Sequence, residues 1–372
     1  MRVIIVHIGE ISYCPPALNV INSLEDLNYE VIVCTTKSKF DLNKKFNKNT
    51  IIREIDINYE KKIGLLNKFI RMIKIKNKIW KEIDKYYNND AIIWVVSDIG
   101  IKHLGKKLLE KKYILHLMEL SEKLTYYHKI RFLKMNEKEY GNKAFKVVVP
   151  EYNRAHIVKA WWGLERLPEI LTNKPYNKIE VSKESKITKS DTAKEIISKL
   201  KGRKIILYQG IIHKERPLDK FIKAIDLLGD EYAFVLMSKG ENIYKDIQSN
   251  NFYYIPFVEP PYHLEITSHA YIGILSYFPV ESDYSILNAL FCAPNKTYEY
   301  SMFGIPMVSN DVPALKYLFE TRKCGKCIEK FNEDNICQAI LEIEAEYKVM
   351  SDNARGYFEE VDIKDSINKI LL

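Results

Sequence analysis

The chain has 372 residues, of which 47% are hydrophobic and 28% charged, and its formal net charge at pH 7 is +8. This length suits two domains, and the composition excludes disordered, collagen-like and disulfide-rich chains. No apolar run reaches the roughly 18 residues of a membrane-spanning helix. The six scattered cysteines indicate reduced thiols, so we expect a cytoplasmic protein of two globular domains.

Short runs rich in β-branched residues alternate with helical patterns through the first half of the chain. The expected strands are residues 3–8, 30–35, 50–55, 91–97, 113–118 and 146–149. Such alternation is typical of a parallel sheet wound with helices. Residues 1–172 are therefore predicted to form an N-terminal Rossmann-like domain.

Positive charge concentrates in this first domain, where 31 Lys and Arg residues face 20 Asp and Glu residues. Segment 61–85 carries nine of these basic residues against two acidic ones, with apolar residues interleaved at Ile63, Leu66, Phe69, Ile70, Ile73 and Trp80. This composition is typical of a basic amphipathic helix on an anionic membrane surface. A helix that packs its apolar face on the sheet explains the same pattern. Basic and aromatic residues form no nucleic-acid recognition module, so we expect no nucleic-acid partner.

Polar sequence separates the two halves of the chain. Residues 173–200 are rich in Ser, Thr and Lys and contain Pro175, which favours an inter-domain linker. A second domain is expected at 201–354, and the C-terminal helical stretch 355–372 is expected to return to the first domain. The strands of this second domain are predicted at 204–208, 233–237, 253–257, 272–275 and 306–309, with helices at 217–228 and 296–302.

Segment 292–313, CAPNKTYEYSMFGIPMVSNDVP, carries the most chemical information. Asn295 can cap a helix that begins at Lys296, and Gly304 can end that helix before an apolar strand. A helix N-terminus with a lysine in its first turn attracts a diphosphate. Glu299, about one turn later, can accept hydrogen bonds from ribose hydroxyls. A solvated surface helix is the alternative interpretation.

Segment 207–225, LYQGIIHKERPLDKFIKAI, places a glycine turn after an expected strand. Gly210 lets a ligand approach the backbone closely. Arg216, six positions later, can form paired bonds with phosphate oxygens.

These two segments resemble the donor-binding domain of GT-B glycosyltransferases, especially the family-4-like group that makes bacterial surface polysaccharides. Residues 294–308 match the PNKxxEYxxxGxPVV pattern of that group, and Gly210 with Arg216 match its glycine and its basic residue. The resemblance implies an α/β GT-B fold, with two doubly wound Rossmann-like domains that face each other across a cleft. It implies six donor-binding residues: Gly9, Gly210, Arg216, Asn295, Lys296 and Glu299.

Two positions depart from the family pattern. Ile211 stands where many members have an arginine, and either Lys296 or Lys214 can supply the missing charge. Phe291 stands where they have a second glutamate, which contacts the donor sugar. The candidates to replace that glutamate, each equally explained as part of a surface loop, are Asp283, Tyr284 and Asn288.

The first domain resembles the same family more weakly, through HIGEISYCPPALNVINSLEDLNYEVIVCT and VVVPEYNRAHIV. The resemblance implies that this domain binds the acceptor, that Gly9 approaches the donor sugar, and that Glu10 is a catalytic candidate beside it. Glu119 lies where relatives often have a histidine at the reaction centre, and a carboxylate there can take the acceptor's proton. The alternative for Glu119 is a helix-starting acid paired with lysines. His116 is expected to be a packed core histidine.

The sequence contains no DxD motif, so catalysis is expected to be metal-independent. Cys324 and Cys327 form one CxxC, but a zinc site needs a second ligand pair at a suitable spacing. We expect no metal and no cofactor, since the nucleotide sugar is a substrate.

The resemblance implies a hexosyl- or related transferase that moves a sugar from a nucleotide sugar, a UDP-sugar, to a saccharide acceptor. The implied acceptor is lipid-linked, in capsule, exopolysaccharide or O-antigen synthesis, and the enzyme would lie peripherally on the inner face of the cell membrane. Two alternatives stay open. One is a sugar-nucleotide epimerase on the same fold, and the other is a catalytically silent partner subunit, which the loss of glutamate at Phe291 favours.

Overall fold

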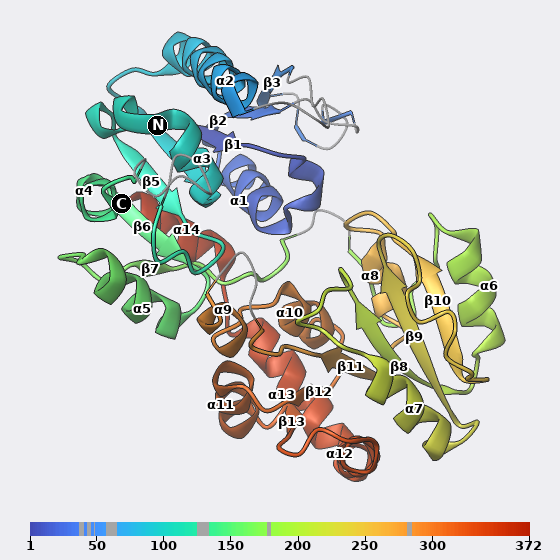
Figure 1. The fold of residues 1–372 in the computed structure, drawn as a ribbon. Coiled ribbons are helices and arrows are strands. Elements are labelled where there is room, and N and C mark those ends of the chain that lie inside the picture. The colour runs from blue at the N-terminus through green and yellow to red at the C-terminus, as the bar shows by residue number, and fades with distance from the viewer. Residues whose placement is uncertain are drawn as a thin grey trace. The chain divides into compact units, whose positions relative to one another are not determined.

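The structure is a computed structural model that describes residues 1–372 except 37–40, 43–45, 48, 57–64, 125–133, 177–179 and 281–284. For Leu65, Leu66 and Lys68 it describes the backbone alone. The chain divides into two compact units (Figure 1). Unit 1 contains Met1–Thr172 and Asp362–Leu372, and unit 2 contains Asn173–Val361.

Unit 1 is built on a seven-stranded sheet in which every neighbouring pair of strands is parallel. Its order is β3-β2-β1-β4-β5-β6-β7. The central strands are buried on both faces, which is why their sequences read as unbroken apolar runs. The strands are β1 (Arg2–His7), β2 (Glu30–Thr36), β3 (Ile51–Ile55), β4 (Ala91–Val96), β5 (Tyr113–His116), β6 (Lys146–Val149) and β7 (Glu169–Ile170).

Helices connect these strands in the way that parallel pairing requires. They are α1 (Pro15–Asp26), α2 (Leu65–Tyr86), α3 (Ser97–Leu104), α4 (Glu137–Lys143) and α5 (Tyr152–Trp162), with the 3-10 helices η1 (Ile11–Tyr13) and η3 (Gly105–Glu110). The last helix of the chain, α14 (Ile363–Leu371), also belongs to unit 1. Its Ile363 and Ile367 are buried, and Tyr29 Oη donates to Asn368 Oδ1 over 3.4 Å.

Unit 2 repeats the same architecture with a six-stranded parallel sheet of order β10-β9-β8-β11-β12-β13. Its strands are β8 (Lys204–Gln209), β9 (Tyr232–Ser238), β10 (Phe252–Pro256), β11 (Ile272–Leu275), β12 (Met307–Asn310) and β13 (Gly325–Ile328). Its helices are α6 (Asp191–Lys199), α7 (Asp219–Leu228), α8 (His263–Thr267), α9 (Leu287–Leu290), α10 (Asn295–Ser301), α11 (Pro313–Arg322), α12 (Glu333–Ala345) and α13 (Tyr347–Glu359).

Both sheets therefore have the doubly wound strand order, in which the chain reverses direction beside its first strand. The reversal lies between β1 and β4 in unit 1 and between β8 and β11 in unit 2. Ligands of open α/β sheets bind beyond the carboxyl ends of the strands at this point. In unit 2, the residues that follow β8 and β11 therefore lie where such a ligand would bind.

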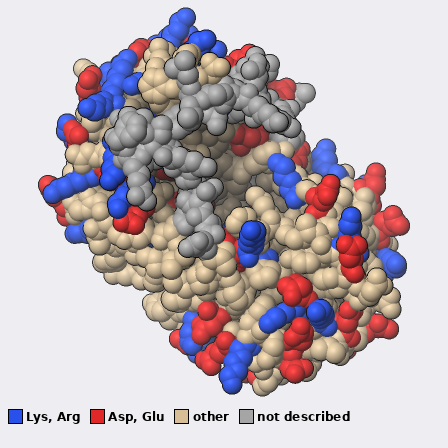
Figure 2. Space-filling model, viewed as in Figure 1, with Lys and Arg blue, Asp and Glu red and all other residues tan. Residues whose placement is uncertain are grey.

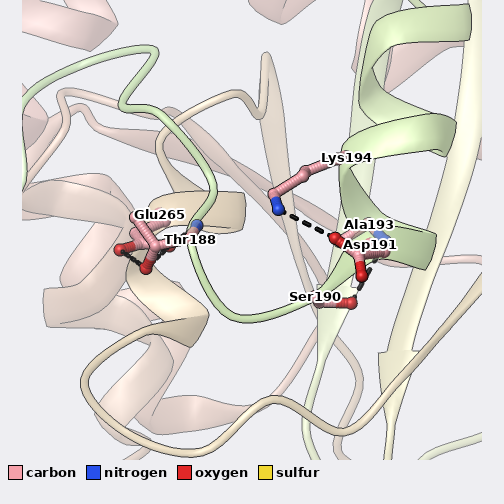
Figure 3. Close-up of polar contacts among 6 residues, drawn as sticks. All are labelled: Thr188, Ser190, Asp191, Ala193, Lys194 and Glu265. Carbon is pink, nitrogen blue, oxygen red and sulfur yellow. Dashed lines mark hydrogen bonds and ion pairs between the residues drawn. The ribbon is translucent and has the colours of Figure 1, made fainter.

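The described residues of the expected linker 173–200 belong to unit 2, which corrects the predicted boundary. Thr188 N–H and Oγ1 donate to the Glu265 carboxylate over 2.6 and 2.7 Å, and Ser190 Oγ caps α6 by accepting from Ala193 N–H (Figure 3). The polar residues that suggested a linker are thus helix-capping and loop-anchoring groups. Polar composition alone does not separate these roles.

The chain returns to unit 1 at Asp362. The predicted return at residue 355 is therefore wrong by seven residues. Met350 and Ala354 of α13 are buried within unit 2. These contacts keep α13 in unit 2 up to the break before α14.

Two edge strands, β7 and β13, were absent from the predicted strands. β13 contains Cys327 of the CxxC motif, and Cys324 immediately precedes it. Cys324 is fully buried, and Cys327 Sγ lies 3.3 Å from Ser309 Oγ on the neighbouring strand. Residues three apart along a strand point to opposite faces, so the two thiols do not converge. Across the described residues, no three His, Cys, Asp or Glu side chains form a group that could hold a metal ion.

Helix α2 packs through only part of its length. Ile75, Ile79, Trp80 and Ile83 are buried, and Trp80 Nε1 donates to Leu104 O over 2.9 Å. Three apolar residues nearer its start stay exposed, namely Phe69, Ile70 and Ile73. No helix in the described parts of the chain is long and apolar enough to cross a membrane.

Candidate functional site

Two strand ends and a glycine meet at the reversal point of unit 2. β8 ends at Gln209, and Gly210 follows with φ +127°, a conformation that residues with side chains rarely adopt. The Gly210 N–H donates to Met237 O over 3.0 Å. Just after β11, Tyr277 N–H donates to Asn310 Oδ1 over 2.8 Å. The backbone on both sides of the reversal point is thereby fixed.

Helix α10 brings the predicted motif to this point, and it is buried from Lys296 to Ser301. This burial excludes a solvated surface helix. The helix begins at Asn295, one residue earlier than predicted, and Asn295 does not cap it. Pro294 is the cap residue, because its carbonyl accepts the N–H of Thr297 over 3.3 Å and the Thr297 hydroxyl over 2.8 Å. Asn295 is consequently a half-buried residue of the first turn.

The carboxylate of Glu299 is held by side chains from two other elements. Gln209 Nε2 donates to Oε2 over 2.5 Å, and His263 Nε2 lies 3.2 Å from Oε1. Thr267 Oγ1 donates to Gln209 Oε1 over 2.6 Å, which turns the amide nitrogen of Gln209 toward Glu299. Burial by itself raises the pKa of Glu299, but His263 and then Gln209 oppose it, and that pKa lies below its usual value. Glu299 is therefore an ionised, oriented acceptor.

Gln209, His263 and Thr267 were not among the predicted site residues. Gln209 could have been noticed, because a polar residue that ends an apolar strand directly before a glycine turn is unusual. His263 and Thr267 lie far from Glu299 in the sequence, on α8. No spacing rule connects them to it.

Lys296 is the most unusual residue of the group. Its side chain is 6% exposed, and its Nζ has no hydrogen-bond partner within the described structure. The Nζ lies 4.2 Å from the ring centroid of Tyr208 and 5.2 Å from that of Tyr277. A Cβ placed on Gly210 would be 3.8 Å from Nζ, so no side chain separates the ammonium group from the glycine turn.

Arg216 lies near the same tyrosine, with Cζ 5.1 Å from the ring centroid of Tyr277. Its loop is pinned at two places, since Arg216 N–H donates to His213 O over 2.8 Å and Phe278 N–H donates to Glu215 O over 2.7 Å. The structure thus brings Gly210, Arg216, Lys296 and Glu299 together on unit 2, as the motif spacing requires. Asn295 lies at the start of the same helix.

The departures from the family pattern also lie near this region. Ile211 is exposed beside the glycine turn, and Phe291 follows the short helix α9. Asn288 lies within α9 and is half-buried. Asp283 and Tyr284 lie outside the described residues.

In unit 1, Gly9 and Glu10 follow β1 at the corresponding reversal point. Gly9 has φ +135°, and its carbonyl accepts the Thr36 hydroxyl over 2.6 Å. A Cβ on Gly9 would be 3.3 Å from His7 Cε1, so a side chain would crowd the histidine. Burial lowers the pKa of His7 to about 4, while Gly9 and Glu10 oppose that shift. Glu10 therefore lies next to a neutral, buried histidine.

Glu119 lies in a bend after β5, so it does not start a helix. Its side chain is 41% exposed, and its Oε2 is 3.9 Å from Nη1 of the buried Arg154. His116 is 1% exposed, and Trp94 Nε1 donates to its Nδ1 over 3.3 Å. The prediction that His116 is a packed core residue is confirmed.

No family model and no curated protein matches this sequence. Solved structures nevertheless resemble it along nearly its whole length. A trehalose-6-phosphate structure from E. coli, bound with UDP-2-fluoro glucose, has a TM-score of 0.68 at 9% identity and covers 100% of this chain and 98% of its own. Anabaena HepE, in complex with UDP and glucose, has a TM-score of 0.66 at 9% identity, with coverage of 100% and 98%.

A third similar structure is WaaG, a glycosyltransferase involved in lipopolysaccharide biosynthesis. Its TM-score is 0.59 at 12% identity, and the alignment covers 99% of this chain and 98% of WaaG. At sequence identities this low, the structural similarity shows a shared fold and nothing more. Together with the two doubly wound parallel sheets, it shows that this chain has the α/β two-domain GT-B fold.

Proposed function

We propose that this protein is a metal-independent glycosyltransferase that moves a sugar from a UDP-sugar to a saccharide acceptor. The observation that carries the proposal is Lys296, a buried amine beside Gly210 and Arg216 that has no hydrogen-bond partner among the described residues. A buried cation is costly unless an anion or acceptor compensates it. A diphosphate at this point would supply that anion. The UDP compounds held by two similar structures favour a UDP-sugar.

Each described group then has a definite part in binding the donor. The glycine at position 210 leaves room for phosphate oxygens to reach the backbone. Glu299 keeps lone pairs free for ribose hydroxyls, because each of its oxygens accepts from one protein partner. In the donor complex, Lys296 and Arg216 would stabilise the negative charge that develops on the leaving diphosphate. Asn295, at the start of α10, is the remaining proposed contact.

We assign the acceptor side to unit 1. Glu119 would take the proton of the attacking hydroxyl, since its half-exposed carboxylate is accessible to a substrate. Gly9 and Glu10 would approach the donor sugar. WaaG's involvement in lipopolysaccharide biosynthesis favours a lipid-linked saccharide of capsule, exopolysaccharide or O-antigen synthesis as the acceptor.

A lipid-linked acceptor would require the enzyme to work at a membrane, and we propose that α2 lies on its surface. Lys and Arg side chains gather over α2 at the top of the view in Figure 2. The exposed Phe69, Ile70 and Ile73 lie on the same helix as these charges. Apolar residues beside basic ones are typical of interfacial helices.

A thermal-shift panel of UDP-, GDP-, dTDP- and CMP-sugars tests the donor class, because a ligand that binds only the folded state raises the melting temperature. UDP-sugars should raise it most. Arg216→Ala and Glu299→Ala should each weaken binding about ten- to a hundred-fold, since a charged hydrogen-bond partner contributes about 1.5–3 kcal/mol. The control Arg322→Ala removes a surface pair with Glu360 and should change nothing. Unchanged affinity in both site variants would refute the placement of the donor.

A transfer assay tests the reaction class. Release of UDP from a UDP-sugar should require a saccharide acceptor, persist in EDTA and fall strongly in Glu119→Gln without loss of donor affinity. Conversion of UDP-GlcNAc without any acceptor would favour the epimerase. Tight UDP binding with no turnover on any lipid-linked acceptor would favour a silent partner subunit.

A further inference from the structure

The described groups around the amine of Lys296 give a positive charge at this position little stabilisation. The rings of Tyr208 and Tyr277 lie beside it, with Nζ 4.2 and 5.2 Å from their centroids. An ammonium ion is attracted to such faces, but a desolvated cation–π contact contributes only about 2 kcal/mol. This contribution is smaller than the desolvation free energy of a buried ammonium group, which is several kcal/mol.

The charged and titratable groups around Lys296 make its protonation still harder. Arg216, from the loop after β8, repels a second positive charge. Glu299 and Cys292 favour the charged form, but both oxygens of Glu299 already face Gln209 and His263. Tyr208 cannot help at neutral pH, because burial raises its pKa to about 12. Burial first, and then Arg216, hold the pKa of Lys296 well below its ordinary value.

We propose that Lys296 is an uncharged amine in the ligand-free protein and takes up one proton from solvent when the diphosphate of the donor binds. This inference rests on the proposed function, because it needs a diphosphate beside Gly210. The diphosphate supplies a hydrogen-bond acceptor and a negative charge beside the Lys296 amine. The proton leaves again when the nucleotide departs, so nucleotide binding and protonation of Lys296 are linked equilibria.

The linkage fixes the direction of the pH dependence. Between the pKa of Lys296 in the free protein and its higher pKa in the complex, the complex holds one more proton than the free protein. Affinity for the diphosphate therefore falls as pH rises through this window, by up to about tenfold per pH unit. Below the window the amine is charged in both states, and this dependence disappears.

Calorimetric titration of the full-length protein with UDP at pH 8, in buffers of different ionisation enthalpy, measures the protons taken up. At this pH the terminal phosphate of UDP is fully ionised, because phosphate monoesters lose their second proton at about pH 6. We expect uptake of about one proton per UDP bound by the wild type. Lys296→Arg keeps the positive charge permanently and should bind UDP without that uptake. Equal uptake in both proteins, or none in the wild type while UDP binds, would overturn the proposal.

Carbon-13 NMR of the lysine Cε groups reports the protonation state directly and does not depend on the variant binding UDP. One signal, missing in Lys296→Arg, should show a neutral amine at pH 8 and become that of an ammonium group on addition of UDP. A charged Lys296 in the free protein, or a neutral one that bound UDP leaves unchanged, contradicts the inference. If UDP perturbs no signal and releases no heat, it is the proposed donor class that fails, while the charge state of free Lys296 is still measured.

Discussion

The substitution Lys296→Met keeps an unbranched side chain of similar length and removes the amine from its buried position. An unpartnered buried polar group costs about 1–3 kcal/mol in proteins, so the ligand-free variant should be more stable than the wild type by about that amount. For a unit of this size, each kcal/mol raises the melting temperature by roughly 2–4 °C. The same variant should lose its stabilisation by UDP, and thermal unfolding with and without UDP measures both effects.

The stability difference between Lys296→Met and the wild type should become smaller as the pH rises. The folded protein holds the pKa of Lys296 below its unfolded value, so the unfolded chain binds the extra proton between the two values. Wild-type stability therefore rises with pH through that window, and the difference between the two proteins shrinks. A ligand-free variant less stable than the wild type would show that Lys296 has a structural role.

Residue identities in the site were predictable only in part. The motif spacing indicated Gly210, Arg216, Lys296 and Glu299, because a glycine turn, two cations and an acid recur in that order. It did not indicate His263, which orients Glu299 from 36 residues away in the sequence. The tertiary packing of α8 against α10 determines this contact, so local sequence patterns do not predict it.

At the scale of elements, the position of α10 depends on a glycine in the strand beneath it. A Cβ on Gly273 of β11 would lie 2.3–2.5 Å from three atoms of the Tyr300 ring. Tyr300 is fully buried and donates from Oη to Leu207 O over 3.0 Å, which anchors the helix to β8. The missing side chain at position 273 is thus what lets α10 approach the sheet.

Gly273→Ala should consequently displace Tyr300 and with it the helix that carries Lys296 and Glu299. Overpacking of this kind costs about 1–3 kcal/mol, and we expect both a lower melting temperature and weaker UDP binding. Gly356→Ala is the matched control, because its new Cβ on α13 meets no atom within 4 Å. That change should stabilise the helix by about 0.5–1 kcal/mol. Wild-type UDP affinity in Gly273→Ala would show that the helix position is not set by this contact.

At the scale of the whole molecule, the exposed surface of α2 predicts binding to anionic lipid. Each basic residue near such a surface contributes about 1 kcal/mol, and salt screens this attraction. Co-sedimentation with phosphatidylglycerol vesicles should fall at high salt and on reversal of four α2 charges to glutamate. The four residues are Arg71, Lys74, Lys78 and Lys81.

The control for this charge reversal changes four lysines of unit 2 to glutamate, so that net charge falls equally. These exposed residues are Lys199, Lys201, Lys223 and Lys348. The control should keep lipid binding. Equal binding of the wild type to neutral vesicles, or equal loss in both variants, would rule out an electrostatic contact through α2.

The sequence by itself determined the two α/β units and most of their strands. A parallel strand buried on both faces must be apolar along its length, and glycine or proline marks its end, so these signals are local. Helix α10 ends at Ser301, and Gly304, with φ +62°, lies in the turn between it and β12. The strands that local signals missed, β7 and β13, lie at sheet edges, where fewer apolar residues are needed.

Only the tertiary structure decided which polar residues became a site. The sequence pattern predicts Asn295 as a helix cap, but Pro294 is the cap residue, and its carbonyl accepts from Thr297. Thr188, in the expected linker, is anchored to Glu265 of unit 2, and the basic helix α2 is packed in one part and exposed in another. Lys296 reads in the sequence as an ordinary charged residue. Its amine is buried, without a hydrogen-bond partner in the described part of the chain, because residues of β8, of the loop after β11 and of α10 come together around it.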